Sequence, residues 1–171
     1  VDFHQCNLKA IPYSCFARSS LQAVTFSPAL QTIGDLAFCC TLLTKVDLHH
    51  TLVERMGCSV FTGCKQLRSV RLPPTLRGLG FSSFETCRRL ETVDLRSCHH
   101  LQRLPSFSFA GCSRLTRVLL PSRLQCIDAF CFMRCTRLRT IGQFDGVVHL
   151  PSVAAIGPSA FEGCRSIKRV L

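Results

Sequence analysis

The sequence contains no tryptophan, a single tyrosine, and only 10 acidic residues against 21 lysines and arginines. Few aromatic residues remain outside the repeated phenylalanines described below, which argues against a surface that stacks unpaired bases. The shortage of acidic residues leaves a formal net charge of +11. Such a surplus predicts attraction to an anionic partner, whether nucleic acid, an acidic protein, an anionic glycan or phospholipid.

Motifs of enzymes and metal proteins are also absent. The chain has no glycine-rich phosphate loop, no nucleophile motif and no kinase-like signature. No two cysteines have the Cys-x-x-Cys spacing of a zinc ribbon. The carboxylates are few and scattered, whereas acid–base catalysis needs them paired across a cleft. We therefore expect no enzyme, no cofactor and no metal site.

A repeated pattern organises the residues that are present. Phenylalanines recur at intervals of 22, 23, 23, 25, 23 and 29 residues, and the apolar residues between them keep the same spacing. The repeated phenylalanines are Phe16, Phe38, Phe61, Phe84, Phe109, Phe132 and Phe161. Because no single copy of about 23 residues can bury its apolar face alone, such a period predicts a stack of coils around a shared core.

Each copy predicts a short strand, a corner and a second extended piece. Val70 and Leu72 alternate with polar residues, as in a strand with one face inward. Pro73 follows directly, and a proline lacks the amide donor that a strand needs to continue. The spacing of Phe61 and Cys64 predicts a single helical turn. First strands are expected at 24–26, 46–48, 70–72, 93–95 and 118–120, and second pieces at 30–33, 76–79, 101–104, 124–127 and 153–156.

This pattern resembles the BspA-type leucine-rich repeat, with the signature L-P-x-x-L-x-x-I-x-x-x-x-F-x-x-C-x-x-L-x-x-V. The match is plainest over residues 120–141, L-P-S-R-L-Q-C-I-D-A-F-C-F-M-R-C-T-R-L-R-T-I, where Ile141 replaces the valine. The resemblance covers essentially the whole chain. It implies an α/β repeat solenoid of about seven copies, with short parallel strands and short helical turns. It also implies a binding surface without a shared catalytic site, in many members on the outside of bacteria and protist parasites.

Thirteen cysteines are present, and five of them stand three residues after a repeated phenylalanine. In a solenoid these five would form an inward column of free thiols that pack as small hydrophobes. The column consists of Cys64, Cys87, Cys112, Cys135 and Cys164. Cysteine usage favours a reducing interior, whereas the family resemblance implies the cell surface, so the localisation stays open.

Arginines and lysines gather in the segments between the cysteine column and the following strand. These segments hold 11 of the 21 basic residues and one acidic residue, Glu91. Stacking would draw them into a basic edge, which is either a solvated polar edge or an anion-facing surface. Repulsion between like charges argues for the second, since a solvated edge would more naturally mix signs. The basic edge comprises Lys65, Arg68, Arg88, Arg89, Arg114, Arg117, Arg137, Arg139, Arg165, Lys168 and Arg169.

Outward positions of the first strands form a predicted concave face. Its residues are Thr25, Asp47, Arg71, Asp94 and Leu119. Opposite charges on neighbouring strands predict a ladder in which Arg71 pairs with both Asp47 and Asp94. The adjacent pairs His49-His50 and His99-His100 are expected to be solvated loop residues, since adjacent side chains diverge.

Two further features concern the extent of the chain. The 29-residue interval includes Asp145-Gly146, a turn signal that indicates a small hairpin or a surface loop. Residues 1–171 are expected to form one solenoid without caps, since the sequence lacks an initial Met and both ends interrupt a copy. No apolar run approaches the roughly 18 residues of a membrane span.

Together these features predict a non-catalytic protein–protein interaction module. The concave face would supply specificity, and the basic edge would supply long-range attraction to a partner such as an acidic protein. A sequence-independent nucleic-acid or ribonucleoprotein binder that uses the basic edge is an alternative. A structural spacer within a larger protein is a second alternative.

Overall fold

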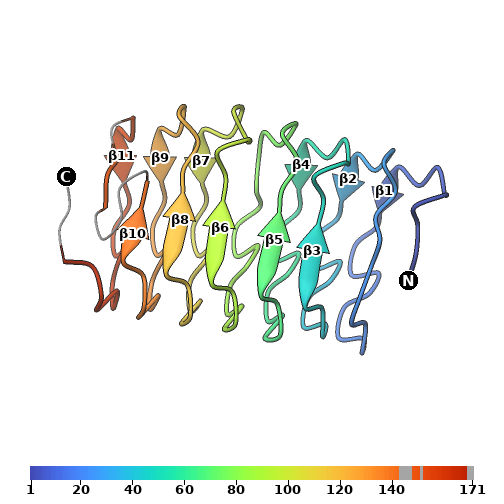
Figure 1. Cartoon of the computed structure of the whole chain (residues 1–171), viewed down its shortest axis with the longest axis horizontal. Coiled ribbons are helices and arrows are strands. Elements are labelled where there is room, and N and C mark those ends of the chain that lie inside the picture. The colour runs from blue at the N-terminus through green and yellow to red at the C-terminus, as the bar shows by residue number, and fades with distance from the viewer. Residues whose placement is uncertain (143–147, 151, 169–171) are drawn as a thin grey trace.

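Successive coils of the chain stack along one long axis, with the N-terminal coil (blue) at one end and β11 (Ala155–Ile156, red) near the other (Figure 1). The computed structural model describes residues 1–142, 148–150 and 152–168. The turn signal at Asp145-Gly146 therefore lies outside the described residues. Every strand pair within the described part is parallel, and the paired residues are about one repeat apart in sequence.

The strands form two sides of the solenoid. The first side is a sheet of β3 (Lys45–Asp47), β5 (Ser69–Arg71), β6 (Thr92–Asp94), β8 (Arg117–Leu119) and β10 (Thr140–Ile141). The second side has one sheet of β1 (Ala10–Ile11), β2 (Thr32–Ile33) and β4 (Arg55–Met56). Its other sheet consists of β7 (Arg103–Leu104), β9 (Cys126–Ile127) and β11 (Ala155–Ile156).

The strand predictions are largely confirmed. The central valine of β3, β5, β6 and β8 is buried, while its neighbours point outward. Two of the expected pieces are weaker than expected, because residues 24–26 and 76–79 contribute only isolated bridges, through Thr25 and Gly78. At Gly78 the glycine weakens the strand, since it brings no side chain to pack.

The third side contains the repeated phenylalanines, and here the predicted helical turn is wrong. Within the described residues there is no helix. Ser59 and Gly63 flank Phe61 at φ values of 55° and 73°, in the left-handed region that interrupts a right-handed helix. The amides of Phe61 and Gly63 instead donate to the carbonyls of Ser83 and Glu85 in the next coil, at 2.9 and 2.8 Å. The third side is therefore a ladder of hydrogen bonds between coils.

The core consists of residues that stack in columns. Each repeated phenylalanine packs face to face on the next, with ring centroids 5.2–5.6 Å apart. Each thiol of the cysteine column donates to the phenylalanine carbonyl of the preceding coil at 3.0–3.2 Å. Cys64, Cys87, Cys112 and Cys135 are buried and Cys164 is half-buried, as the repeat predicts.

Candidate functional site

The outward face of the first sheet carries the charged residues expected there. Arg71 of β5 lies 3.4 Å from the Asp47 carboxylate of β3, and Lys45 approaches the same oxygen at 3.4 Å. Partial burial acts to raise the pKa of Asp47. The hydrogen bond from the His49 amide and the charges of Lys45 and Arg71 outweigh it, and they hold this pKa below its ordinary value.

The second half of the predicted charge ladder is wrong. Arg71 and Asp94 are register partners on β5 and β6, but the Asp94 carboxylate pairs with Arg96 at 2.7 Å. The hydrogen bond from Arg96 lowers the pKa of Asp94. Asp47, Arg71, Asp94 and Leu119 are register partners in successive coils and so lie in one row of the first sheet. Leu119 is half-buried, and Thr25 is exposed and forms a bridge with Asp2.

The basic edge lies at the corner between the third side and the first sheet. Nine of its residues are exposed and make no ion pair within the described part of the chain. These nine are Lys65, Arg68, Arg88, Arg89, Arg114, Arg137, Arg139, Arg165 and Lys168. Arg117 is half-buried beside Asp94, whose pKa its charge helps to lower, and Arg169 lies outside the described residues.

Three residues of this edge share one register position in three successive coils. Arg89, Arg114 and Arg137 each stand five residues after a repeated phenylalanine and one residue before a buried leucine. The phenylalanine ring centroids of these coils are 5.5 Å apart, and paired parallel strands lie about 4.8 Å apart, so the row rises by about 5 Å from one coil to the next. We call this row the arginine ladder. The sequence contained its signal, since counting from each phenylalanine separates this row from the rest of the edge.

Beside the arginine ladder, the third side is hollowed by a notch of about 410 Å³. Its floor is Ala110-Gly111, and its walls are Glu85-Thr86 of the preceding coil and Met133-Arg134 of the following coil. The backbone of the floor is already paired, because the Thr86 amide donates to Ala110 and the Gly111 amide to Met133, both at 2.7 Å. These amides are therefore not available to hydrogen-bond a ligand. The notch can still accept side chains of a ligand.

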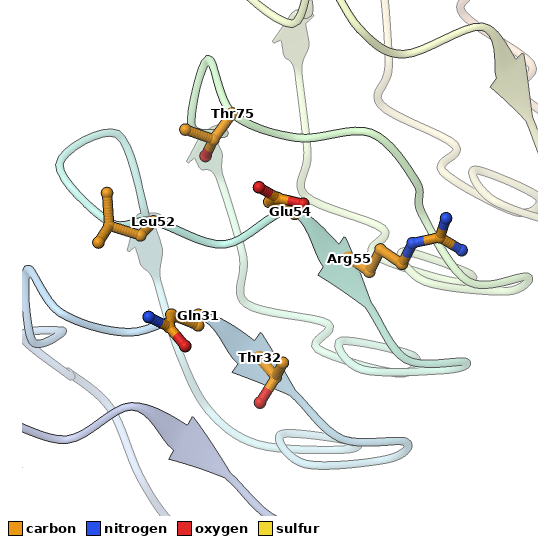
Figure 2. Close-up of a pocket in the computed structure, with 6 residues that line it drawn as sticks. All are labelled: Gln31, Thr32, Leu52, Glu54, Arg55 and Thr75. Atoms are coloured by element: carbon orange, nitrogen blue, oxygen red, sulfur yellow. The ribbon is translucent and has the colours of Figure 1, made fainter.

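A second depression, of about 510 Å³, lies where the first sheet turns into the second side (Figure 2). The side chains that surround it come from three successive coils. They are Gln31, Thr32, Leu52, Glu54, Arg55 and Thr75. Leu52 is 50% exposed, and Gly78, the register neighbour of Arg55, adds no side chain to fill the space. The sequence pattern did not predict this depression.

The cysteines and histidines form no metal-binding group of three or more ligands within the described residues. All thirteen cysteines are free thiols. Burial raises the pKa of Cys112 to about 12 and, with its neighbour Cys40, that of Cys39 to about 11. His50 and both residues of His99-His100 are exposed, as expected for loop residues, and His49 is half-exposed. Over the described part of the chain, no helix has the length and apolarity to cross a bilayer.

Comparison with protein families gives one match. The family description of the BspA type leucine-rich repeat region matches residues 1–57 and 40–168 in six copies. The expectation of about seven copies is therefore not confirmed. Comparison with curated proteins finds no match.

Several solved structures are similar to the chain. A leucine-rich repeat protein from Bacteroides ovatus is 29% identical with a TM-score of 0.66, and the match covers 96% of this chain and 46% of that one. A leucine-rich cell surface protein from Faecalibacterium prausnitzii is 20% identical with a TM-score of 0.56, over 99% and 62% of the two chains. The leucine-rich repeat protein of T. pallidum is 20% identical with a TM-score of 0.59, over 95% and 79%. The chain thus spans less than half of the Bacteroides protein and under two thirds of the Faecalibacterium one.

Proposed function

The chain belongs to the BspA-type leucine-rich repeat family, and on that premise we propose that it is a non-catalytic module that binds another protein. Repeats of this kind are commonly protein-interaction modules. The basic edge attracts an anionic surface of the partner, and the outward row of the first sheet selects among partners. We also propose that residues 1–171 form a single solenoid.

The observation that carries the proposal is the exposed, unpaired charge of the basic edge. Nine exposed cations of this edge have no ion pair within the described residues, whereas five of the ten cations elsewhere on the chain are paired with carboxylates. Those five are Lys45, Arg71, Arg77, Arg96 and Arg103. Neighbouring coils bring the cations close together, so their mutual repulsion is relieved when an anionic partner binds. If this edge only had to be solvated, charges of both signs would be sufficient and would not repel one another.

The outward row of the first sheet is the proposed specificity surface. Asp47 and Arg71 present a fixed pair at its N-terminal end, and Leu119 adds an apolar position towards the other end. Fixed charges at known spacing reject partners that place like charges opposite them.

A capture experiment tests the proposal. The protein is immobilised beside a variant in which Arg88, Arg89, Arg114, Arg137 and Arg139 are replaced by Gln, and bound protein and nucleic acid are both analysed. A control variant removes five cations elsewhere on the surface, and circular dichroism confirms that all three are folded. The control carries Gln at Lys9, Arg18, Arg55, Arg77 and Arg123.

The proposal expects a protein partner that the edge variant loses and the control variant keeps. A partner retained equally by both variants would refute the role of the basic edge. Recovery of nucleic acid alone, with affinity that falls steeply with salt and ignores sequence, would replace the proposal by a nucleic-acid binder. A second variant, Asp47→Asn with Asp94→Asn, tests the outward row, since loss of the same partner is expected if that row selects it.

A further inference from the structure

The arginine ladder and the notch lie side by side, and we propose that together they bind an acidic peptide segment of the partner that also carries an apolar side chain. The segment runs along the solenoid axis, across three coils. Its carboxylates meet Arg89, Arg114 and Arg137, and its apolar side chain enters the notch. This inference rests on the proposed function, because it specifies the partner surface that the basic edge attracts.

The two features adjoin residue by residue. Arg88, Ser113 and Thr136 line the notch, and each directly precedes one arginine of the ladder. The ladder arginines do not line the notch themselves, but each stands one residue beyond a lining residue, so the ladder runs beside the notch. Arg134 of the following coil and Arg88 of the preceding coil both line the notch, so cations from two coils contribute to its lining.

The notch exists because one coil has small residues where its neighbours have larger ones. Ala110 and Gly111 occupy the register positions of Glu85 and Thr86 in one neighbouring coil and of Met133 and Arg134 in the other. A Cβ on Gly111 would lie 3.1 Å from Cγ2 of Thr86, so any larger residue would narrow the hollow. The floor and the Met133 wall are apolar, and such a surface gains free energy by covering an apolar side chain.

The ladder favours an extended ligand parallel to the axis. Its guanidinium groups branch from backbone positions one coil apart, a distance of about 5 Å given the spacing of neighbouring strands. In an extended peptide, side chains on one face recur about every 6.7 Å. Arginine side chains are long enough to accommodate this difference, and each can donate two hydrogen bonds to one carboxylate.

An acidic peptide fits this site better than a nucleic acid. Base stacking needs exposed aromatic rings beside the cations. Phe81 is 57% exposed and Phe107 stacks on Phe130, but all three precede the repeated phenylalanines, at the corner of the third side away from the basic edge. The notch offers instead a place for one apolar side chain, which a sulfated glycan does not possess.

Fluorescence anisotropy with synthetic probes tests the inference at an ionic strength of about 0.15 M. The first probe is a peptide of about eight residues, rich in Glu with a central Leu, and it crosses the ladder at about 3.3 Å per residue. The second probe has Gly in place of Leu. Oligouridine and a heparin oligosaccharide are the third and fourth. We expect the Leu peptide to bind about tenfold more tightly than the Gly peptide.

Substitutions to residue types that other copies carry at the same register position separate the contributions of the arginine ladder and the notch. Arg89→Gln, Arg114→Gln and Arg137→Gln together introduce the residue that occupies this register at Gln66. This triple variant should weaken both peptides at least about tenfold. Met133→Thr introduces the residue type that Thr62 has at the same register, and it should abolish the preference for Leu and leave the Gly peptide unchanged.

A matched control removes three cations from other surfaces. It combines Lys9→Gln, Arg55→Thr and Arg123→Thr, and it should bind both peptides within about twofold of the wild type, since long-range attraction is screened at this salt concentration. Circular dichroism and thermal melting establish that every variant is folded.

Equal binding of the Leu and Gly peptides, or a Leu preference that survives Met133→Thr, would overturn the inference. Tighter binding of oligouridine or the heparin oligosaccharide than of the Leu peptide would also overturn it, as would equal weakening by the triple variant and its control. The proposed function fails separately, if the capture experiment finds no protein partner that depends on the basic edge.

Discussion

Replacing Phe109 tests whether the phenylalanine column holds the solenoid together. The side chain is fully buried, and its ring stacks on Phe84 at 5.5 Å and 4° and on Phe132 at 5.5 Å and 6°. Phe109→Leu keeps most of the apolar volume but removes both aromatic contacts. At about 1 kcal/mol for each pair, we expect the free energy of unfolding to fall by about 2 kcal/mol. The melting temperature should fall by about 4–8 °C in a chain of this size.

The same substitution at the end of the column is the matched control. Phe161 is half-buried and stacks only on Phe132, at 5.6 Å. Phe161→Leu should therefore cost about 1 kcal/mol, half the cost at Phe109. Phe109→Ala creates a cavity as well, and its cost should rise to about 3–5 kcal/mol.

Urea denaturation followed by circular dichroism measures these differences. We expect Phe109→Ala to be the most destabilising, Phe109→Leu to be intermediate and Phe161→Leu to be the least destabilising. If Phe109→Leu were as stable as the wild type, or cost no more than Phe161→Leu, stacking between coils would not be what the column contributes.

Three other perturbations follow from the geometry. Gly80→Ala would place a Cβ 2.2 Å from a backbone carbonyl oxygen of the preceding coil, and it should lower the free energy of unfolding by about 2–3 kcal/mol in urea denaturation. Gly78→Ala is the control, because the nearest atom to its Cβ is 4.0 Å away, and it should lower this free energy by under about 1 kcal/mol. Native alkylation with iodoacetamide, followed by mass spectrometry, should label exposed Cys40 and spare Cys112, whose pKa burial raises to about 12. Asp47→Asn should cost under about 1 kcal/mol at neutral pH. Because the folded pKa of Asp47 is lowered, this difference should be present above the unfolded pKa and disappear as the pH falls through the folded value, in urea titrations at successive pH values.

Much of the fold could be predicted because the repeat places the same residue types at the same positions. Alternation around residues such as Val70 identified the first strands, and the spacing of phenylalanine and cysteine identified the two buried columns. The helical turn was predicted wrongly because residues such as Leu36 and Arg134 have no preference of their own for positive φ. Their left-handed conformation is maintained by hydrogen bonds to the next coil, for example from the Leu36 amide to Cys58 at 2.9 Å.

The candidate site shows the same division. The basic edge could be predicted from the sequence, but the predicted pairing of Arg71 with Asp94 was wrong. Arg96 lies only two residues from Asp94 and pairs with its carboxylate in place of Arg71 on the neighbouring strand. The notch was not visible either, since it depends on Ala110 lying between larger residues of two other coils.

The sequence by itself determined the solenoid, its period and its buried columns, because the burial of apolar residues depends on a spacing that recurs within each copy. Only the tertiary structure decided the conformation of the third side and the position of the notch. Those features arise between residues about one repeat apart, where backbone groups of adjacent coils meet and small residues such as Gly111 lie against larger ones. Contact across coils, rather than local preference, sets the shape of the proposed binding surface.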